Sequence, residues 1–522
     1  MSDGEKRIKD NYLHIQNNMT RRTLLAALAS AALLAACDKN SGENVSPVSI
    51  TSFGIYAEDN TQQIENDIIA TEISGDVIEL PLPYGFVLDS LKNVVVRFTA
   101  TEGSVVNIAD ESGMPSGEAI VSRVSALDLS GTAQLIVSKD NNYKVYNVTH
   151  KIESSKWDKL AETSLSMKTD PVLTVNPTDG APYLAGAETE TSFPHLFKFD
   201  GGVLKDVAGA LKETESSAFA LDFNPYGTPF VSFSDKSAGS KQTVVYVNGS
   251  EVGYIGEAGT LPAVSVASNN PSAVFPLSSS NVWSAFCLNR AADGVAKRGL
   301  YLSEYNGTDW MKPKIFANSD ASKNAAIIIG RYRNDKFYMF ICNVSIPSFS
   351  VYSYSTTEWT PVLENVKIKT SDGASDAIFY KSPRPMDMDI DSKGNVYVYA
   401  CADFNTDGTV TPGVVRIDPA TGSQTLIGGS INDFENFEGH MTFSLAIGKD
   451  DAPHIVNLYK AGSSYRAYYR TIDSKTKTWA EPELIYDRGA DYAVIRTDKD
   501  GKPYVALRDD DTDKYVLFGK AE

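Results

Sequence analysis

One short segment has the residue types and spacing of a calcium-binding loop. The sequence D-F-N-T-D-G at 403–408 places oxygen ligands at alternating positions, Asp403, Asn405 and Asp407, followed by a glycine. This spacing matches the first half of a twelve-residue calcium loop, but the twelfth position is Val414, where a bidentate glutamate is needed. The same residues also make a good turn. We therefore expect either a weak calcium site or a plain turn here, and no other cofactor.

A second set of polar residues forms a candidate ligand rim. They stand near the ends of predicted strands in a repeated unit, where loops of several repeats converge on one face. Carboxylates and arginines around a central pocket are the groups that glycoside chemistry uses. Any single one of these residues can instead be an ordinary charged loop residue with no role in binding. The candidate rim consists of Asp235, Arg290, Arg384, Asp387, Asp403, His440, Lys460, Arg508 and Asp509.

The element that would position this rim is a repeat of about 50 residues across 153–522. Most of the units contain a turn with Gly or Asp followed by an aromatic-centred strand. The period, with β-type alternation throughout, predicts a seven-bladed β-propeller. The turns and second strands are D-G-A-P-Y-L-A (179–185), Y-G-T-P-F-V-S (226–232), S-N-V-W-S-A (280–285), N-D-K-F-Y-M-F (334–340), K-G-N-V-Y-V-Y (393–399), D-A-P-H-I-V (451–456) and D-G-K-P-Y-V-A (500–506).

Tryptophans predict how the propeller closes. Trp310, Trp359 and Trp479 each open a predicted fourth strand, but the seventh unit ends at Phe518 without one. The segment S-K-W-D-K-L at 155–160 supplies the missing piece, so we expect an N-terminal strand to complete the last blade and remove two open sheet edges.

The aligned repeats also place three of the four cysteines at one equivalent position. Cys287, Cys342 and Cys401 each stand four residues beyond the aromatic position. Neighbouring blades hold such positions too far apart for a disulfide, and no ligand spacing for zinc accompanies them. We expect buried free thiols. His454 occupies the aromatic position of its own repeat and is expected to be a core substitution.

The segment before the repeat predicts a smaller β domain. Residues 48–152 contain short alternating runs such as D-V-I-E-L-P-L-P and N-V-V-V-R-F-T-A, separated by turn residues and without a helical stripe. This length and spacing suit one β-sandwich. The region resembles the Ig-like domains of unknown function found near the anchor of many bacterial lipoproteins, which implies a spacer.

The first 47 residues predict export and lipid attachment. Arg21 and Arg22 precede an apolar run, Leu24–Ala36, which is too short to span a bilayer and has the layout of a secretory signal. The run ends in L-A-A-C, which resembles the lipobox of bacterial lipoproteins, of the surface-exposed type found in gut Gram-negative bacteria. The resemblance implies that residues 1–36 are a signal peptide, with Met19 as an alternative start, and that Cys37 is lipidated. Residues 37–47 then form the lipidated cysteine and tether.

The net charge of the chain limits the partners that the protein can bind. The chain has 66 acidic and 48 basic residues, a net charge of −18. Such a protein is a poor ligand for nucleic acid or for anionic lipid. The expected membrane contact is the lipid anchor, at the outer membrane and facing the cell exterior.

Together these features predict an all-β cell-envelope lipoprotein whose propeller binds a glycan or a protein partner without catalysis. Motifs of serine hydrolases, zinc proteases and phosphate loops are absent from the sequence. Two alternatives stay open: a propeller glycoside hydrolase or polysaccharide lyase acting on an extracellular glycan, and a structural component of a surface assembly. The aromatic residues near predicted loops that could stack on sugars are Tyr226, Phe404, Tyr459 and Tyr492.

Overall fold

The computed structural model describes most of the chain from Val48 to Ala521. The described residues are 48–64, 66–110, 112–256, 272–288, 299–316, 325–343, 348–354, 358–368, 387–404, 410–429, 431, 443–461 and 464–521. Within these ranges the structure is all-β, as predicted, with two short 3₁₀ turns, η1 (Ala57–Asp59) and η2 (Leu88–Leu91), and no α-helix. No helix in the same ranges is long and apolar enough to cross a membrane.

The chain divides into two compact units. Unit 1 comprises the described residues up to Pro81 together with Val87–Lys151. Unit 2 comprises Leu82–Phe86 and the described residues from Ile152 onward.

Unit 1 is built from two antiparallel sheets. Residues that alternate along β4 (Val77–Leu82) are fully buried, including Ile78 and Leu80, which is the pattern of a strand with one face on a core. The first sheet has the order β2 (Ile68–Ile69), β1 (Ile50–Ile55), β5 (Val94–Ala100) and β8 (Ala126–Leu127). The second has the order β3 (Glu72–Ser74), β4, β10 (Asn142–Ile152), β9 (Ala133–Lys139), β6 (Val105–Ala109) and β7 (Pro115–Ser116).

Unit 2 contains seven four-stranded antiparallel sheets within the described residues. Six of them use consecutive strands. These are β12 (Val172–Val175), β13 (Pro182–Ala187), β14 (Pro194–Asp200) and β15 (Val203–Asp206); β16 (Ser216–Phe223), β17 (Pro229–Asp235), β18 (Lys241–Asn248) and β19 (Glu251–Tyr254); β20 (Ser272–Ser278), β21 (Asn281–Leu288), β22 (Gly299–Tyr305) and β23 (Lys314–Ile315); β24 (Ala325–Arg333), β25 (Lys336–Asn343), β26 (Ser348–Tyr354) and β27 (Trp359–Val366); β28 (Asp387–Ile390), β29 (Val396–Phe404), β30 (Val410–Ile417) and β31 (Gln424–Ile427); and β32 (Ser444–Ile447), β33 (Pro453–Ala461), β34 (Ser464–Thr471) and β35 (Glu483–Leu484).

The seventh sheet joins two distant parts of the chain. Its order is β11 (Trp157–Glu162), β38 (Tyr515–Lys520), β37 (Pro503–Asp509) and β36 (Ala490–Thr497). The pairing of β11 with β38 is the N-terminal strand addition that the sequence predicted from the position of Trp157.

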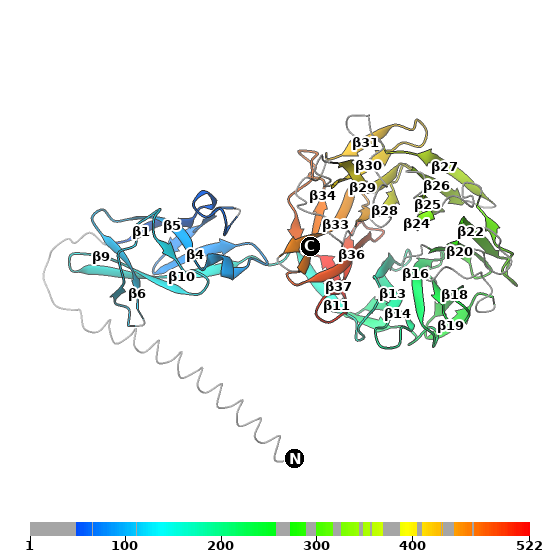
Figure 1. Ribbon diagram of the computed structural model, residues 1–522, viewed down its shortest axis with the longest axis horizontal. Helices are drawn as coiled ribbons and strands as arrows, with labels where there is room; N and C mark the ends of the chain where they lie inside the picture. The colour runs from blue at the N-terminus through cyan, green and yellow to red at the C-terminus, as the bar shows by residue number, and fades with distance from the viewer. Residues whose placement is uncertain are drawn as a thin grey trace, which may run out of the picture. The chain divides into compact units, whose positions relative to one another are not determined.

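The sheets of unit 2 succeed one another around a common centre, in a propeller-like arrangement. The first strand of each sheet contacts the first strand of the next, from β12 through β16, β20, β24, β28 and β32 to β36, and β36 in turn contacts β12. Figure 1 shows β16, β24, β28 and β36 on the inner side of this arrangement. The seven predicted aromatic strands are the second strands of the seven sheets, from β13 to β37.

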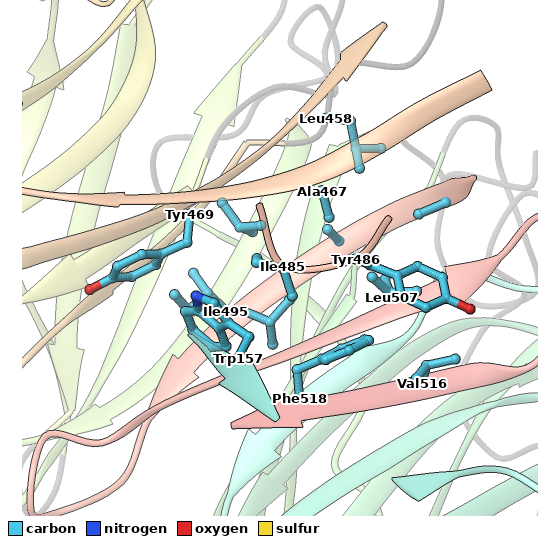
Figure 2. Packing of buried hydrophobic residues seen from close by; sticks show 14 of the residues in the cluster. Trp157, Leu458, Ala467, Tyr469, Ile485, Tyr486, Ile495, Leu507, Val516 and Phe518 are labelled. Carbon is cyan, nitrogen blue, oxygen red and sulfur yellow. The ribbon is translucent and has the colours of Figure 1, made fainter. Parts of the chain in front are cut away.

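The joined sheet is fixed by an apolar cluster around Trp157. This side chain is 2% exposed, and its ring lies edge-on to Tyr469 with the ring centres 5.0 Å apart. Figure 2 shows Trp157 beside Ile495 and near Phe518, so that side chains from β11, β34, β36 and β38 share one core. Burial of a side chain of this size contributes several kcal/mol to the stability of the closure.

Two further tryptophans, Trp310 and Trp479, link neighbouring sheets of unit 2. Trp310 donates through Nε1 to the carbonyl of Ile255 at 2.6 Å, and Trp479 donates to the carbonyl of Gly429 at 3.2 Å. Each acceptor belongs to the preceding sheet's final segment, so each indole ties one sheet to its neighbour.

Of the three cysteines predicted to be buried free thiols, the structure describes the side chain of one, Cys342. Cys342 is fully buried on β25 and free, and burial raises the pKa of its thiol. The side chains of Cys287 and Cys401 lie outside the described residues. His454 is packed against Tyr469, whose hydroxyl lies 2.6 Å from His454 Nδ1, and burial lowers the histidine pKa to about 4.

Candidate functional site

Unit 2 contains a cavity of about 780 Å³, here called the central cavity. Its walls come from the first strands, because residues of β12, β16, β20, β24, β28, β32 and β36 all line it. Much of the wall carries hydroxyl groups, which offer hydrogen-bond donors and acceptors together. These side chains are Thr169, Thr174, Ser192, Ser216, Ser217, Ser234, Ser240, Ser272 and Ser444.

Loops of two kinds contribute to the central cavity. Lys168 and Glu215 precede first strands, whereas Ser192 and Lys236 follow second strands. Lys168 Nζ donates to Ser192 Oγ at 2.9 Å, and Lys236 is paired with Glu215.

Two arginines of the central cavity share one carboxylate. Arg331 on β24 and Arg496 on β36 both form ion pairs with Asp387, the first residue of β28. Asp387 Oδ2 accepts from Arg496 Nη1 at 2.9 Å and from Ser444 Oγ at 3.0 Å. The backbone N–H of Leu445 donates to the same oxygen at 3.0 Å. Asp387 is therefore held by three sheets, and Arg331 and Arg496 are called the arginine pair below.

A second buried carboxylate has an arginine of its own. Asp389 accepts from Arg333 Nε at 2.9 Å and from Arg333 Nη2 at 2.8 Å, which is a bidentate ion pair. The backbone N–H of Ile447 adds a third hydrogen bond at 2.9 Å. Burial acts to raise the pKa of Asp389, but the charge and hydrogen bonds of Arg333 outweigh it, so that the pKa is lowered.

Asp222 on β16 is a third buried carboxylate, and it lines the central cavity. Its Oδ1 accepts a hydrogen bond from the backbone N–H of Phe223 at 2.8 Å. Among the described residues no side chain forms an ion pair with it or donates to it. Burial raises the pKa of Asp222 to about 7, although the charges of Arg331, Arg333 and Arg496 oppose this shift. Asp222 is therefore partly protonated near neutral pH.

Four of the charged residues in and next to the central cavity hold equivalent positions in different sheets. In each case the residue on the first strand is the cross-strand partner of the aromatic residue on the second strand. The pairs are Asp222 with Phe230, Arg331 with Tyr338, Asp389 with Tyr397, and Arg496 with Tyr504.

Arg508, one of the rim residues predicted from the sequence, lines the central cavity together with Asp387. Its Nη2 donates to Asp491 at 3.0 Å and its Nη1 to the carbonyl of Lys168 at 2.8 Å. Its guanidinium also lies over the ring of Tyr492, 5.5 Å from the ring centre, so this predicted sugar-stacking residue is at the cavity as well.

Asp235 and Asp509 occupy equivalent positions at the ends of β17 and β37, and neither lines the central cavity. Asp235 is paired with Lys212 and accepts from Ser237 Oγ at 2.7 Å. Asp509 accepts from Thr512 Oγ1 at 2.8 Å. Both carboxylates thus hold the turn between a second and a third strand. For Asp235, burial acts to raise the pKa, but its donors lower it to about 2.

The remaining candidates are not brought together. Lys460 is exposed near the end of β33 and does not line the central cavity. Asp403 lies in β29, with a backbone partner at Thr411, but its side chain is outside the described part of the chain. Tyr226 is 80% exposed on the turn between β16 and β17. Arg290, Arg384 and His440 lie outside the described residues.

The calcium prediction stays open for the same reason, because Asn405 and Asp407 lie outside the described residues. In the part of the chain that the structure describes, no group of three or more His, Cys, Asp or Glu side chains is arranged to hold a metal ion.

Sequence reasoning missed most of the charged residues in and next to the central cavity. Asp222, Arg331, Arg333, Asp389 and Arg496 lie on first strands, whereas the repeats were aligned on the turn and the second strand. A usable signal was present, since four of them stand a nearly constant distance before the aromatic position of their repeat.

Comparisons with known protein families and with curated proteins find no match for this chain. Among solved structures it is similar to a fungal alcohol oxidase of the AA5 family in complex with copper, with a TM-score of 0.43, 11% identity, and coverage of 70% of this chain and 77% of the other. It is also similar to the polysaccharide lyase Uly1, with a TM-score of 0.40, 11% identity, and coverage of 68% and 90%. A third is the Aleuria aurantia lectin in complex with Fucα1-6GlcNAc, with a TM-score of 0.34, 11% identity, and coverage of 57% and 89%. Scores this low assign neither a family nor an activity to the chain.

Proposed function

We propose that this protein binds a glycan in the central cavity, without catalysis, as a lipid-anchored protein of the cell envelope. The observation that carries the proposal is the chemistry of the cavity wall. Hydroxyl side chains from several sheets line it together with charged groups and with Phe219 and Tyr492. Dense hydrogen-bonding groups beside apolar rings match a sugar, which has hydroxyls around its edge and an apolar face.

The proposed location in the cell is inferred from the sequence. The lipobox-like L-A-A-C and the tether that follows it support lipidation of Cys37 and exposure at the outer membrane. In the same proposal unit 1 is an Ig-like spacer, and the seven sheets of unit 2 are the seven blades of a propeller.

The state of Asp387 favours binding over hydrolysis. A glycosidase uses two carboxyl groups: one donates a proton, and the other must be free to act as a base or a nucleophile. Asp387 lines the cavity, but the arginine pair, Ser444 and Leu445 already occupy its oxygens. It is therefore a poor nucleophile or base.

One observation favours the catalytic alternative. Asp222 is buried, lines the cavity and has a pKa raised by burial to about 7, which is the property of a general acid that works near neutral pH. As a second candidate function, unit 2 would cleave the glycan that it binds, with Asp222 as the proton donor.

A glycan-array screen with analysis of the bound sugars for cleavage products tests both candidates. We expect binding without cleavage. Cleavage that is lost in the Asp222→Asn variant would replace the proposal with the catalytic candidate. A lack of binding to every glycan on the array would overturn both.

A further inference from the structure

The charges on the cavity wall are unbalanced around the arginine pair. Arg331 and Arg496 carry two positive charges, and Asp387 is the one carboxylate paired with both of them. Their side chains are only 13% and 16% exposed, so solvent screens this excess weakly. Burial and the neighbouring charge of Arg496 lower the pKa of Arg331 to about 10, which leaves it protonated at neutral pH.

Two arginines of the cavity wall, Arg331 and Arg508, also have unused hydrogen-bonding capacity. Arg331 Nε is buried and has no hydrogen-bond partner among the described residues. The same holds for Nε of Arg508, the third arginine on the cavity wall. Buried guanidinium donors usually have a partner, so each of these two arginines keeps a donor that the described residues leave unsatisfied.

Asp222 does not offset this excess when it is protonated. Its counterpart Asp389 is matched by Arg333 through two hydrogen bonds, whereas Asp222 has no arginine of its own. Protonated, Asp222 adds no negative charge and can donate a hydrogen bond. Three arginines, Arg331, Arg333 and Arg496, act on the charge of Asp222, and Tyr332 is a further titratable neighbour. The other titratable side chains on the cavity wall are Lys168, Asp170, Glu215, Lys236, Asp387, Tyr492 and Arg508.

We infer that the ligand of the central cavity is an acidic saccharide, whose carboxylate is held by the arginine pair with Asp222 as a neutral hydrogen-bond donor. The inference rests on the proposed glycan-binding function and specifies its ligand. A carboxylate fits the planar fork of a guanidinium better than a neutral hydroxyl does, and charge-assisted hydrogen bonds are about twice as strong as neutral ones. A local cationic site is also what an acidic sugar needs on a chain of net charge −18.

The inference links ligand binding to the ionisation of Asp222. A bound carboxylate disfavours a second negative charge beside it, so binding stabilises the protonated form of Asp222. Affinity of the wild-type protein is therefore expected to fall by about tenfold for each pH unit above the pKa of Asp222. The Asp222→Asn variant carries a neutral amide at every pH, so it is expected to keep its affinity over the same range.

The test is titration calorimetry of the full chain with three oligosaccharides of one length. These are a uronic-acid oligosaccharide, the same compound with its carboxyl groups reduced to alcohols, and a sulfated neutral oligosaccharide. We expect the uronate to bind at least tenfold more tightly than the reduced compound. Equal affinity for these two compounds, or tighter binding of the sulfated one, would overturn the inference while leaving glycan binding intact. If none of the three compounds binds while the array identifies a neutral glycan, the inference of an acidic ligand is wrong and the proposed glycan binding still stands.

Variants separate charge recognition from folding. Arg496→Gln is expected to reduce uronate affinity at least tenfold and to have little effect on the reduced compound. Because this change can also weaken the fold, Asp222→Asn provides an independent measurement between about pH 6 and pH 8. Wild-type affinity that does not change over this range, or an Asp222→Asn variant with the same pH dependence as wild type, would overturn the role of Asp222.

Discussion

Asp222 and Asp389 hold the same register position in two sheets of unit 2, opposite Phe230 and Tyr397, yet only Asp389 is paired with an arginine. The pKa of Asp389 is lowered, whereas burial raises that of Asp222 to about 7. One carboxylate is thus a fixed part of the fold. The other lines the central cavity and changes its charge near neutral pH.

The first prediction concerns stability and the ionisation of Asp222. Its pKa is about 7 in the folded protein against an ordinary value of 3.8, so the folded state holds a proton that the unfolded chain has released between these values. Stability contributed by Asp222 is therefore lost as pH rises, by up to about 4 kcal/mol above pH 7. Compared with wild type, Asp222→Asn should gain stability progressively from about pH 4 to pH 7 and keep that gain above it. Urea unfolding across this range measures the gain, and a gain that is independent of pH would contradict the account.

The second prediction has the opposite sign. The pKa of Asp235 is about 2, below its ordinary 3.8, so its contribution to stability is present above pH 4 and disappears as pH falls through 2. Asp235→Asn should reduce the free energy of unfolding by about 2 kcal/mol at neutral pH. The reduction should shrink in acid, as thermal unfolding at several pH values would show. An unchanged stability at neutral pH would mean that Lys212 and Ser237 do not hold this carboxylate as described.

The third prediction concerns the pair of Arg333 and Asp389. Arg333→Gln removes the partner of a fully buried carboxylate and should destabilise unit 2 by about 3–5 kcal/mol. The double variant Arg333→Gln with Asp389→Asn leaves no unpaired charge and should recover a large part of that loss. Denaturant unfolding of both variants checks this, and a double variant less stable than the single one would argue against the pair.

The fourth prediction concerns closure of the joined sheet. Trp157→Ala removes the side chain at the centre of the cluster shown in Figure 2 and should cost about 3–5 kcal/mol. Tyr226→Ala, which removes a side chain that is 80% exposed, is the matched control and should change stability by less than about 0.5 kcal/mol. Equal effects of the two changes would show that β11 does not fix the fold.

Much of unit 2 could be predicted from the sequence because its second strands repeat a turn followed by an aromatic residue. That pattern located all seven second strands, and the unmatched Trp157 identified the strand that pairs with β38. The composition, with β-type alternation throughout, also predicted the all-β class.

The cavity residues were harder to predict, because a charged residue such as Arg496 in V-I-R-T looks like one exposed position of an alternating strand. Only the ring of first strands turns that position inward. Asp235 and Asp509 show the converse difficulty. They stand near loops, as ligand residues often do. Their carboxylates, however, accept hydrogen bonds from nearby hydroxyl groups and so stabilise turns.

The central claim, that the central cavity binds a glycan, is tested most directly by filling the cavity. Ser217 is half-buried and lines it, so Ser217→Trp would place an indole in the binding space. Ser250→Trp makes the same change at an exposed residue between β18 and β19, away from the cavity wall. Titration calorimetry with the glycan identified on the array should show binding by wild type and Ser250→Trp, and loss of binding by Ser217→Trp. Undiminished binding by a folded Ser217→Trp protein would contradict the claim.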